Sequence, residues 1–187
     1  MSYTTILAIT PGESVEHIAE LRNSWGSANL IWDAIWNAYG DKRHEYDSAL
    51  TAGDRLWGIY DDPRLSESDR AAFAMTFDRW FVAKKDYARI AKDIGKFMSR
   101  HNVGGHWVAI RDLFLSNPDH AGIGFWWTSV AENPFNGEWD EEAEDYGPPD
   151  WDRVYSLYDQ IDADAAALRA TDDAGGAAKA PDTGEGE

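Results

Sequence analysis

The chain has 187 residues, no cysteine and a formal net charge of −17, and 43% of its residues are hydrophobic. These values exclude a disulfide framework and a thiolate metal site. The first residues lack a basic start, and no apolar run reaches the roughly 20 residues of a membrane span. We therefore expect a cytoplasmic protein that buries a core of its own.

The N-terminal part begins with a predicted strand, because Tyr3–Ile9 is β-branched and apolar and is followed by Pro11-Gly12. Apolar residues at a spacing of three, namely Val15, Ile18 and Leu21, predict a helix from Ser14 to about Trp25. Two further helices are predicted over residues 27–40 and 42–59, the second ending before Pro63.

The middle of the chain is predicted to be mainly helical. A helix begins near Ser66 or Ser68, but Thr76–Val82 fits a helix or a strand equally well and stays open. Two clearer helices follow, over residues 86–100 and 106–115. Ile123–Val130 has the best strand composition of the chain, and its consecutive Trp126 and Trp127 would point to opposite faces of the sheet.

The last part is strongly acidic. Residues 132–164 carry 12 carboxylates and one base, whereas residues 1–131 carry 17 acids and 14 bases. Prolines and glycines predict an irregular, aromatic-rich loop over about 132–152, and a final helix is predicted to start at Asp150 or Asp152. Residues 171–187 are Gly, Ala and acid, so we expect a disordered, dispensable tail.

These elements predict an α+β fold that is predominantly helical, with five or six helices packed on a small sheet. The sheet would contain residues 3–9, 123–130 and, if that segment is a strand, 76–82. Residues 1–170 would form one globular domain, followed by the tail. Four residues at apolar helix positions are predicted to be core: Trp25, Ile35, Leu56 and Phe97.

Four bases recur on one face of the helix predicted over 86–100 and just before it: Lys85, Arg89, Lys92 and Lys96. This basic stripe has three open interpretations: it docks the chain's own acidic loop, binds nucleic acid, or faces water. The overall acidity makes nucleic-acid binding the least favoured of the three.

Catalytic and metal-binding motifs are not evident. The five histidines show no metal-ligand spacing, Ser129 lacks a nucleophile elbow, and the acidic loop lacks the ligand pattern of an EF-hand. We expect no metal, no cofactor and no enzymatic activity. The alternative is a small hydrolase or a binder of carbohydrate or another small ligand, which would use Glu132 and the neighbouring Trp residues.

The charge pattern favours binding to a basic macromolecular surface, because a lopsided negative field attracts bases and repels nucleic-acid phosphate. Carboxylates interleaved with aromatic rings combine electrostatic steering with rigid anchors. We therefore expect an inhibitor that mimics nucleic acid and blocks a basic protein surface, such as that of a nucleic-acid-binding enzyme. Neither nucleic acid nor a membrane would bind directly. Antirestriction, anti-CRISPR and toxin-immunity proteins, from phages or mobile elements, act in this way as a class, and the chain matches them in charge character alone.

The expected partner-binding residues are Glu138, Trp139, Asp140, Glu141, Glu142, Glu144, Asp145, Tyr146, Asp150, Trp151 and Asp152.

Overall fold

The computed structural model describes residues 3–22, 28–43, 48–127 and 134–176. Its main sheet has five strands in the order β2-β1-β4-β3-β7, and a separate two-stranded sheet pairs β5 with β6. The main-sheet strands are β1 Tyr3–Thr10, β2 Ser14–Arg22, β3 Trp80–Ala83, β4 Gly122–Trp126 and β7 Tyr155–Ser156. All pairings in it are antiparallel except that of β3 with β7.

Seven α-helices are found in the described part of the chain, so the predicted α+β, predominantly helical fold is confirmed. The helices are α1 Ala28–Tyr39, α2 Ala49–Ala52, α3 Asp54–Gly58, α4 Glu67–Ala74, α5 Tyr87–His101, α6 His106–Leu115 and α7 Leu157–Gly176. Three short 3-10 helices complete the list: η1 Ile59–Asp61, η2 Lys84–Asp86 and η3 Trp151–Arg153. None of the described helices is both long and apolar enough to span a lipid bilayer.

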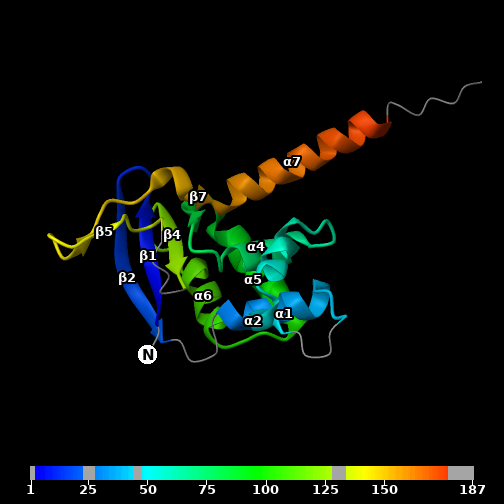
Figure 1. Cartoon of the computed structure of the whole chain (residues 1–187), viewed down its shortest axis with the longest axis horizontal. Coiled ribbons are helices and arrows are strands. Elements are labelled where there is room, and N and C mark those ends of the chain that lie inside the picture. Colours follow the sequence, from blue (N-terminus) through cyan, green and yellow to red (C-terminus); the bar gives the residue numbers. More distant parts are fainter. Residues whose placement is uncertain (1–2, 23–27, 44–47, 128–133, 177–187) are drawn as a thin grey trace, which may run out of the picture.

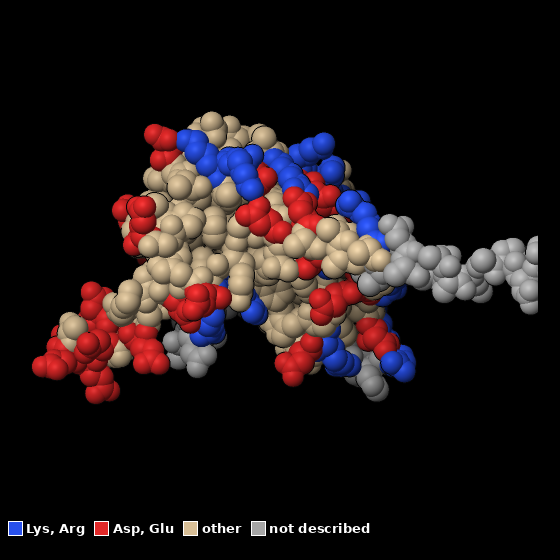
Figure 2. Space-filling view, turned by 90° about the horizontal axis from the view of Figure 1, so that it is seen from above, with Lys and Arg blue, Asp and Glu red and all other residues tan. Residues whose placement is uncertain are grey.

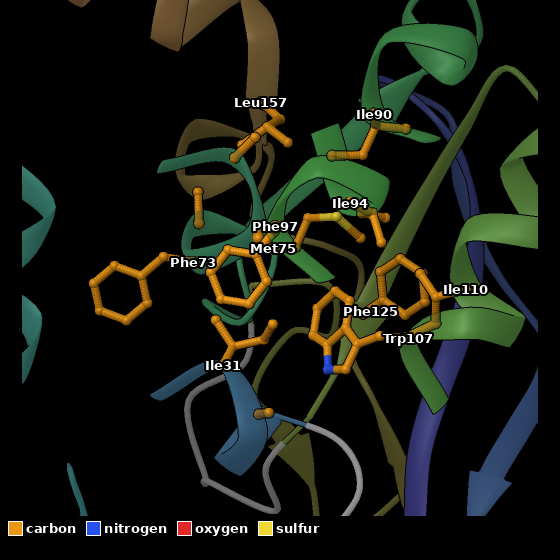
Figure 3. Close-up of a cluster of buried hydrophobic side chains, with 14 of the residues drawn as sticks. Ile31, Phe73, Met75, Ile90, Ile94, Phe97, Trp107, Ile110, Phe125 and Leu157 are labelled. Atoms are coloured by element: carbon orange, nitrogen blue, oxygen red, sulfur yellow. The ribbon is translucent and has the colours of Figure 1, made fainter. Parts of the chain in front are cut away.

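The helices pack on one face of the sheet, while the segment that carries β5 and β6 lies on the other side (Figure 1). The larger core lies between the sheet and the helices and contains Ile31, Phe73, Ile94 and Trp107 among many apolar side chains (Figure 3). The predicted core residues Ile35, Leu56 and Phe97 are buried there, as expected. Trp25 lies outside the described residues.

A smaller apolar cluster covers the outer face of the sheet, and we call it the outer cluster. Gly124 of β4 makes room for it, because a Cβ there would lie 2.7 Å from Ile9 Cδ1 and 3.0 Å from Phe135 Cζ. Phe135 is thereby buried against the sheet and fixes the start of the acidic segment. The outer cluster contains Leu7, Ile9, Phe81 and Phe135, with Val15, Ala83, Trp126, Trp151 and Val154 packed on it.

The helix predicted over residues 14–25 is wrong, because residues 14–22 form β2. β2 has nine residues against eight in β1, and the register shifts so that His17 lies opposite Leu7 and Ala19 opposite Ile6. Ile18 is the extra residue, a β-bulge. The bulge turns Val15 toward the outer cluster and Leu21 toward the larger core. The apolar residues spaced three apart therefore belong to a strand. The bulge in its middle exchanges the two faces, so that Val15 and Leu21 point to opposite sides of the sheet.

The other differences lie at element boundaries. The helix predicted over 42–59 is divided into α2 and α3, because Gly53 adopts a φ of 54° between them. The ambiguous segment 76–82 is a turn followed by β3, and β4 ends at Trp126. The final helix starts only at Leu157, because residues 151–156 pack on the outer cluster and pair with β3. It continues to Gly176, so the backbone of residues 171–176, which the sequence assigned to the tail, is helical, and residues 177–187 lie outside the described part.

Candidate functional site

The acidic aromatic segment, predicted to be an irregular loop, forms a short β-hairpin instead. Strands β5 Trp139–Asp140 and β6 Asp145–Tyr146 pair with Trp139 opposite Tyr146 and Asp140 opposite Asp145. We call residues 138–146 the acidic hairpin. It projects from the body at the end away from α7 (Figure 1), and Figure 2 shows its carboxylates gathered at that end of the molecule.

Backbone contacts at both ends of the acidic hairpin fix its shape. At its base, Gly137 and Gly147 cross closely: Gly137 N donates to Gly147 O over 3.0 Å, and a Cβ on Gly137 would lie 2.5 Å from Pro148 O. At the tip, Asp140 Oδ1 accepts from the backbone amides of Glu142 and Ala143 over 2.8 and 3.1 Å. The glycines and Asp140 therefore specify a tight ribbon where charge alone would favour an open loop.

A chain of aromatic rings joins the acidic hairpin to the sheet. The ring of Trp139 meets that of Tyr146 edge to face at a centroid distance of 5.1 Å, and Tyr146 meets Trp126 in the same way at 6.3 Å. Trp126 belongs to the outer cluster. Trp139 is nevertheless 52% exposed and Tyr146 45% exposed. Both rings are thus held in place while much of their surface stays available to a partner.

The carboxylates of the acidic hairpin are exposed and uncompensated. None of them forms an ion pair with a base in the part of the chain that the structure describes. Asp140 and Asp145 lie directly opposite each other, an arrangement that disfavours pairing of the two strands because like charges repel. The exposed carboxylates are Glu138, Asp140, Glu141, Glu142, Glu144 and Asp145. A cationic partner would relieve this repulsion.

The structure separates the last three predicted site residues from the hairpin. Asp150, Trp151 and Asp152 lie at η3, after the hairpin has returned to the body. Trp151 is half buried against the outer cluster, so it is not the exposed anchor that we expected. Asp150 approaches Arg153 at 3.9 Å, and Asp152 is exposed. The exposed aromatic rings of the segment are therefore those of Trp139 and Tyr146.

The basic stripe docks acids of the chain, but not those of the acidic hairpin. Lys85 Nζ lies 2.6 Å from Asp159, and Arg89 Nη2 lies 2.7 Å from Asp162 and 2.9 Å from Glu67. Hydrogen bonding to Asp162, followed by that to Glu67, raises the pKa of the Arg89 guanidinium, although partial burial opposes it. The start of α7 is thus neutralised internally, whereas the carboxylates of the acidic hairpin are not paired with a base among the described residues.

Sequence reasoning missed a second charged cluster, which lies beside the core. Asp69 is completely buried and accepts from Tyr39 Oη at 2.5 Å and from Arg100 Nη1 at 2.7 Å, while His101 Nε2 lies 3.2 Å from its other oxygen. Asp69 N in turn donates to Ser66 Oγ, the cap of α4. A Ser three residues before an acid is a capping pattern that could have drawn attention to Asp69. The cluster ties α1, α4 and α5 together.

Of the residues in the alternative, ligand-binding interpretation, the structure describes Trp126 and Trp127, which lie on opposite faces of the sheet. Trp127 is buried, stacks on Trp107 at 5.3 Å and donates its indole N–H to Met75 O, so it belongs to the core. Trp126 points to the opposite face, as predicted. Glu132 and Ser129 lie outside the described residues. Within the described ranges, no group of three or more His, Asp or Glu side chains is placed to hold a metal ion.

In comparisons with known proteins, no family model, no curated protein and no solved structure matches the chain.

Proposed function

We propose that this protein is a non-catalytic inhibitor that uses the acidic hairpin to bind and block a basic surface of another macromolecule. The observation that carries the proposal is the pair of exposed rings, Trp139 and Tyr146, set among unpaired carboxylates on a projecting ribbon. Charge accelerates and orients the encounter, and desolvated aromatic rings supply most of the binding energy.

The partner class that fits this surface is a nucleic-acid-binding enzyme. Such an enzyme presents closely spaced Lys and Arg side chains, because it must neutralise a phosphate backbone with one charge per about 1.7 Å of duplex. Six carboxylates within residues 138–145 offer negative charge at comparable density, and a narrow ribbon can enter a groove. Occupying that groove would exclude the nucleic acid.

The first prediction concerns the charge of the acidic hairpin. Replacing Asp140, Glu141, Glu142, Glu144 and Asp145 by Asn and Gln is expected to slow association with the partner by roughly tenfold or more at low salt. The remaining binding should depend less on salt, because fewer charges are screened. The partner is captured from lysate with the parent chain, purified, and its association rate measured at several salt concentrations.

A matched control separates the site from the net charge. Neutralising five exposed acids elsewhere, Glu13, Glu16, Glu20, Asp54 and Asp61, changes the net charge equally and should leave the association rate close to that of the parent. If the captured partner binds nucleic acid, the parent should displace a labelled duplex from it and the hairpin variant should not. Equal binding by the hairpin variant and the parent would contradict the proposal.

The second prediction concerns the exposed ring. Trp139→Ala should raise the dissociation rate by roughly tenfold or more while changing the association rate little, because the ring acts after the charges have steered the encounter. Leu115→Ala, which shortens a side chain that is 62% exposed on α6, is the control and should change neither rate. If the Trp139 variant dissociated at the same rate as the parent, the Trp139 ring would not be part of the interface. Surface-immobilised partner and a concentration series of each variant give both rates.

A further inference from the structure

Strand β2 forms one edge of the main sheet and is unusually open. It pairs with β1 on one side, and no other described strand pairs with it. Residues 16–20 are exposed on both faces of the strand. An edge of this length presents unpaired N–H and C=O groups, and such an edge is a template for pairing with a strand of another molecule.

The bulge at Ile18 is not required for packing of the sheet. Val15 lies opposite Ile9 and Leu21 opposite Thr4, on opposite faces of the sheet. A regular eight-residue strand without Ile18 would keep both pairings, because His17 and Ala19 already face Leu7 and Ile6, which are consecutive in β1. The extra residue therefore affects the unpaired edge and not the core. It interrupts the regular spacing of the backbone N–H and C=O groups that point away from β1.

The His17 side chain also occupies a backbone group at this edge. His17 Nε2 lies 3.2 Å from Ala19 O, so the ring engages a backbone carbonyl next to the bulge. Glu16 and Glu20 flank the same stretch, and His17 also approaches Glu20 Oε1 at 3.7 Å. A neighbouring strand centred on Ile18 in an antiparallel pair would bring Glu16 of one copy opposite Glu20 of the other, which like-charge repulsion disfavours.

We propose that the Ile18 bulge, with the His17 contact to Ala19, guards the edge of β2 against antiparallel pairing with a second copy of this chain. The net charge repels copies at long range, but salt screens it beyond about 8 Å at physiological ionic strength. Paired strands approach to about 4.8 Å, where local geometry decides whether hydrogen bonds can form. The guard therefore acts at contact, after salt has weakened the long-range repulsion between copies.

The test is deletion of Ile18 together with His17→Ala. At raised salt this variant should shift from monomer toward dimer as its concentration increases, measured by light scattering after size exclusion. The parent and Ile18→Thr, which keeps the bulge and loses the apolar side chain, should remain monomeric. A folded deletion variant that stays monomeric at every concentration would overturn the proposal.

The site of contact is tested separately, because the chain contains no cysteine. His17→Cys, used in place of His17→Ala in the deletion variant, lies beside the centre of the expected pair and should form an intermolecular disulfide on mild oxidation, whereas Asp61→Cys in the deletion variant, on the distant η1, should not. A dimer that does not cross-link through position 17 would place the contact elsewhere and overturn the proposal.

A further variant keeps the inference testable if the deletion chain does not fold. Glu16→Thr, His17→Thr and Glu20→Thr together remove both acids and the ring from residues 16–20 of the edge but retain the bulge. This variant should remain monomeric at raised salt. Its dimerisation would show that side chains, and not the bulge, guard the edge.

Discussion

Replacing Asp69 by Ala is expected to lower the free energy of unfolding by about 3 kcal/mol, because it removes the charge on which a buried network depends. Tyr39, Arg100 and His101 all contact this carboxylate, which is completely buried. Arg100 is 47% exposed, so its guanidinium can be solvated once Asp69 is gone. The expected loss of stability is therefore at the lower end of the range for breaking a buried ion pair. Urea unfolding followed by circular dichroism gives the difference.

The loss should depend on pH in a defined direction. Burial alone would raise the pKa of the Asp69 carboxyl, but hydrogen bonds from Tyr39 and Arg100 and the neighbouring His101 bring it below its ordinary value. A carboxyl with a lowered folded pKa stabilises the fold above its unfolded pKa of about 3.9 and loses that contribution as pH falls through the folded pKa. The stability gap between the parent and Asp69→Asn should therefore narrow below about pH 4.

A surface pair provides the control for Asp69. Asp112 and Arg111 form an exposed ion pair on α6, and Asp112→Ala should change the unfolding free energy little, because water screens such pairs. A loss for Asp69→Ala no greater than that for Asp112→Ala would show that the buried cluster does not stabilise the fold.

Phe97→Ala should cost about 3–5 kcal/mol, because it deletes a completely buried ring from α5 and leaves a cavity. The ring centroid also lies 4.5 Å from that of His101, so Phe97 positions a member of the Asp69 cluster. We therefore expect the effects of Phe97→Ala and Asp69→Ala to be non-additive in the double variant. Thermal and urea unfolding of the two single variants and the double variant measure this coupling.

Leu115→Ala is the matched control for Phe97, since Leu115 is largely exposed and its loss should change stability by less than about 0.5 kcal/mol. If Phe97→Ala were as stable as the parent, the buried ring would not contribute to packing, and the prediction would be wrong.

The agreement between sequence and structure is best where one physical signal dominates. α5 and α6 follow their predicted ranges closely, because regular apolar spacing against a single core has one solution. Apolar spacing is misleading in β2. The Ile18 bulge interrupts the two-residue alternation of the strand, so its apolar residues fall at a spacing of three, as they would on a helix. Nothing in the residue types of 14–22 distinguishes the two, since the difference depends on Ile9 and Thr4 of the neighbouring strand.

The candidate site shows the same division. Composition identifies the acidic aromatic segment and its residues, because a run of carboxylates with Trp and Tyr is visible in one dimension. It does not reveal that Gly137 and Gly147 cross at the base of a ribbon, or that Trp151 turns inward while Trp139 stays exposed. Both depend on Phe135 and Trp126, which fix the segment to the outer face of the sheet.

The sequence by itself therefore determined the charge asymmetry, the helix-rich α+β class and the residues of the acidic segment, because these follow from composition and local periodicity. Only the tertiary structure decided which charges remain unpaired. It neutralises the start of α7 with Lys85 and Arg89, buries Asp69 beside Arg100, and leaves the acidic hairpin without a base among the described residues. Ion pairing depends on distances of a few ångströms between residues far apart in the chain, and such distances exist only once the chain has folded.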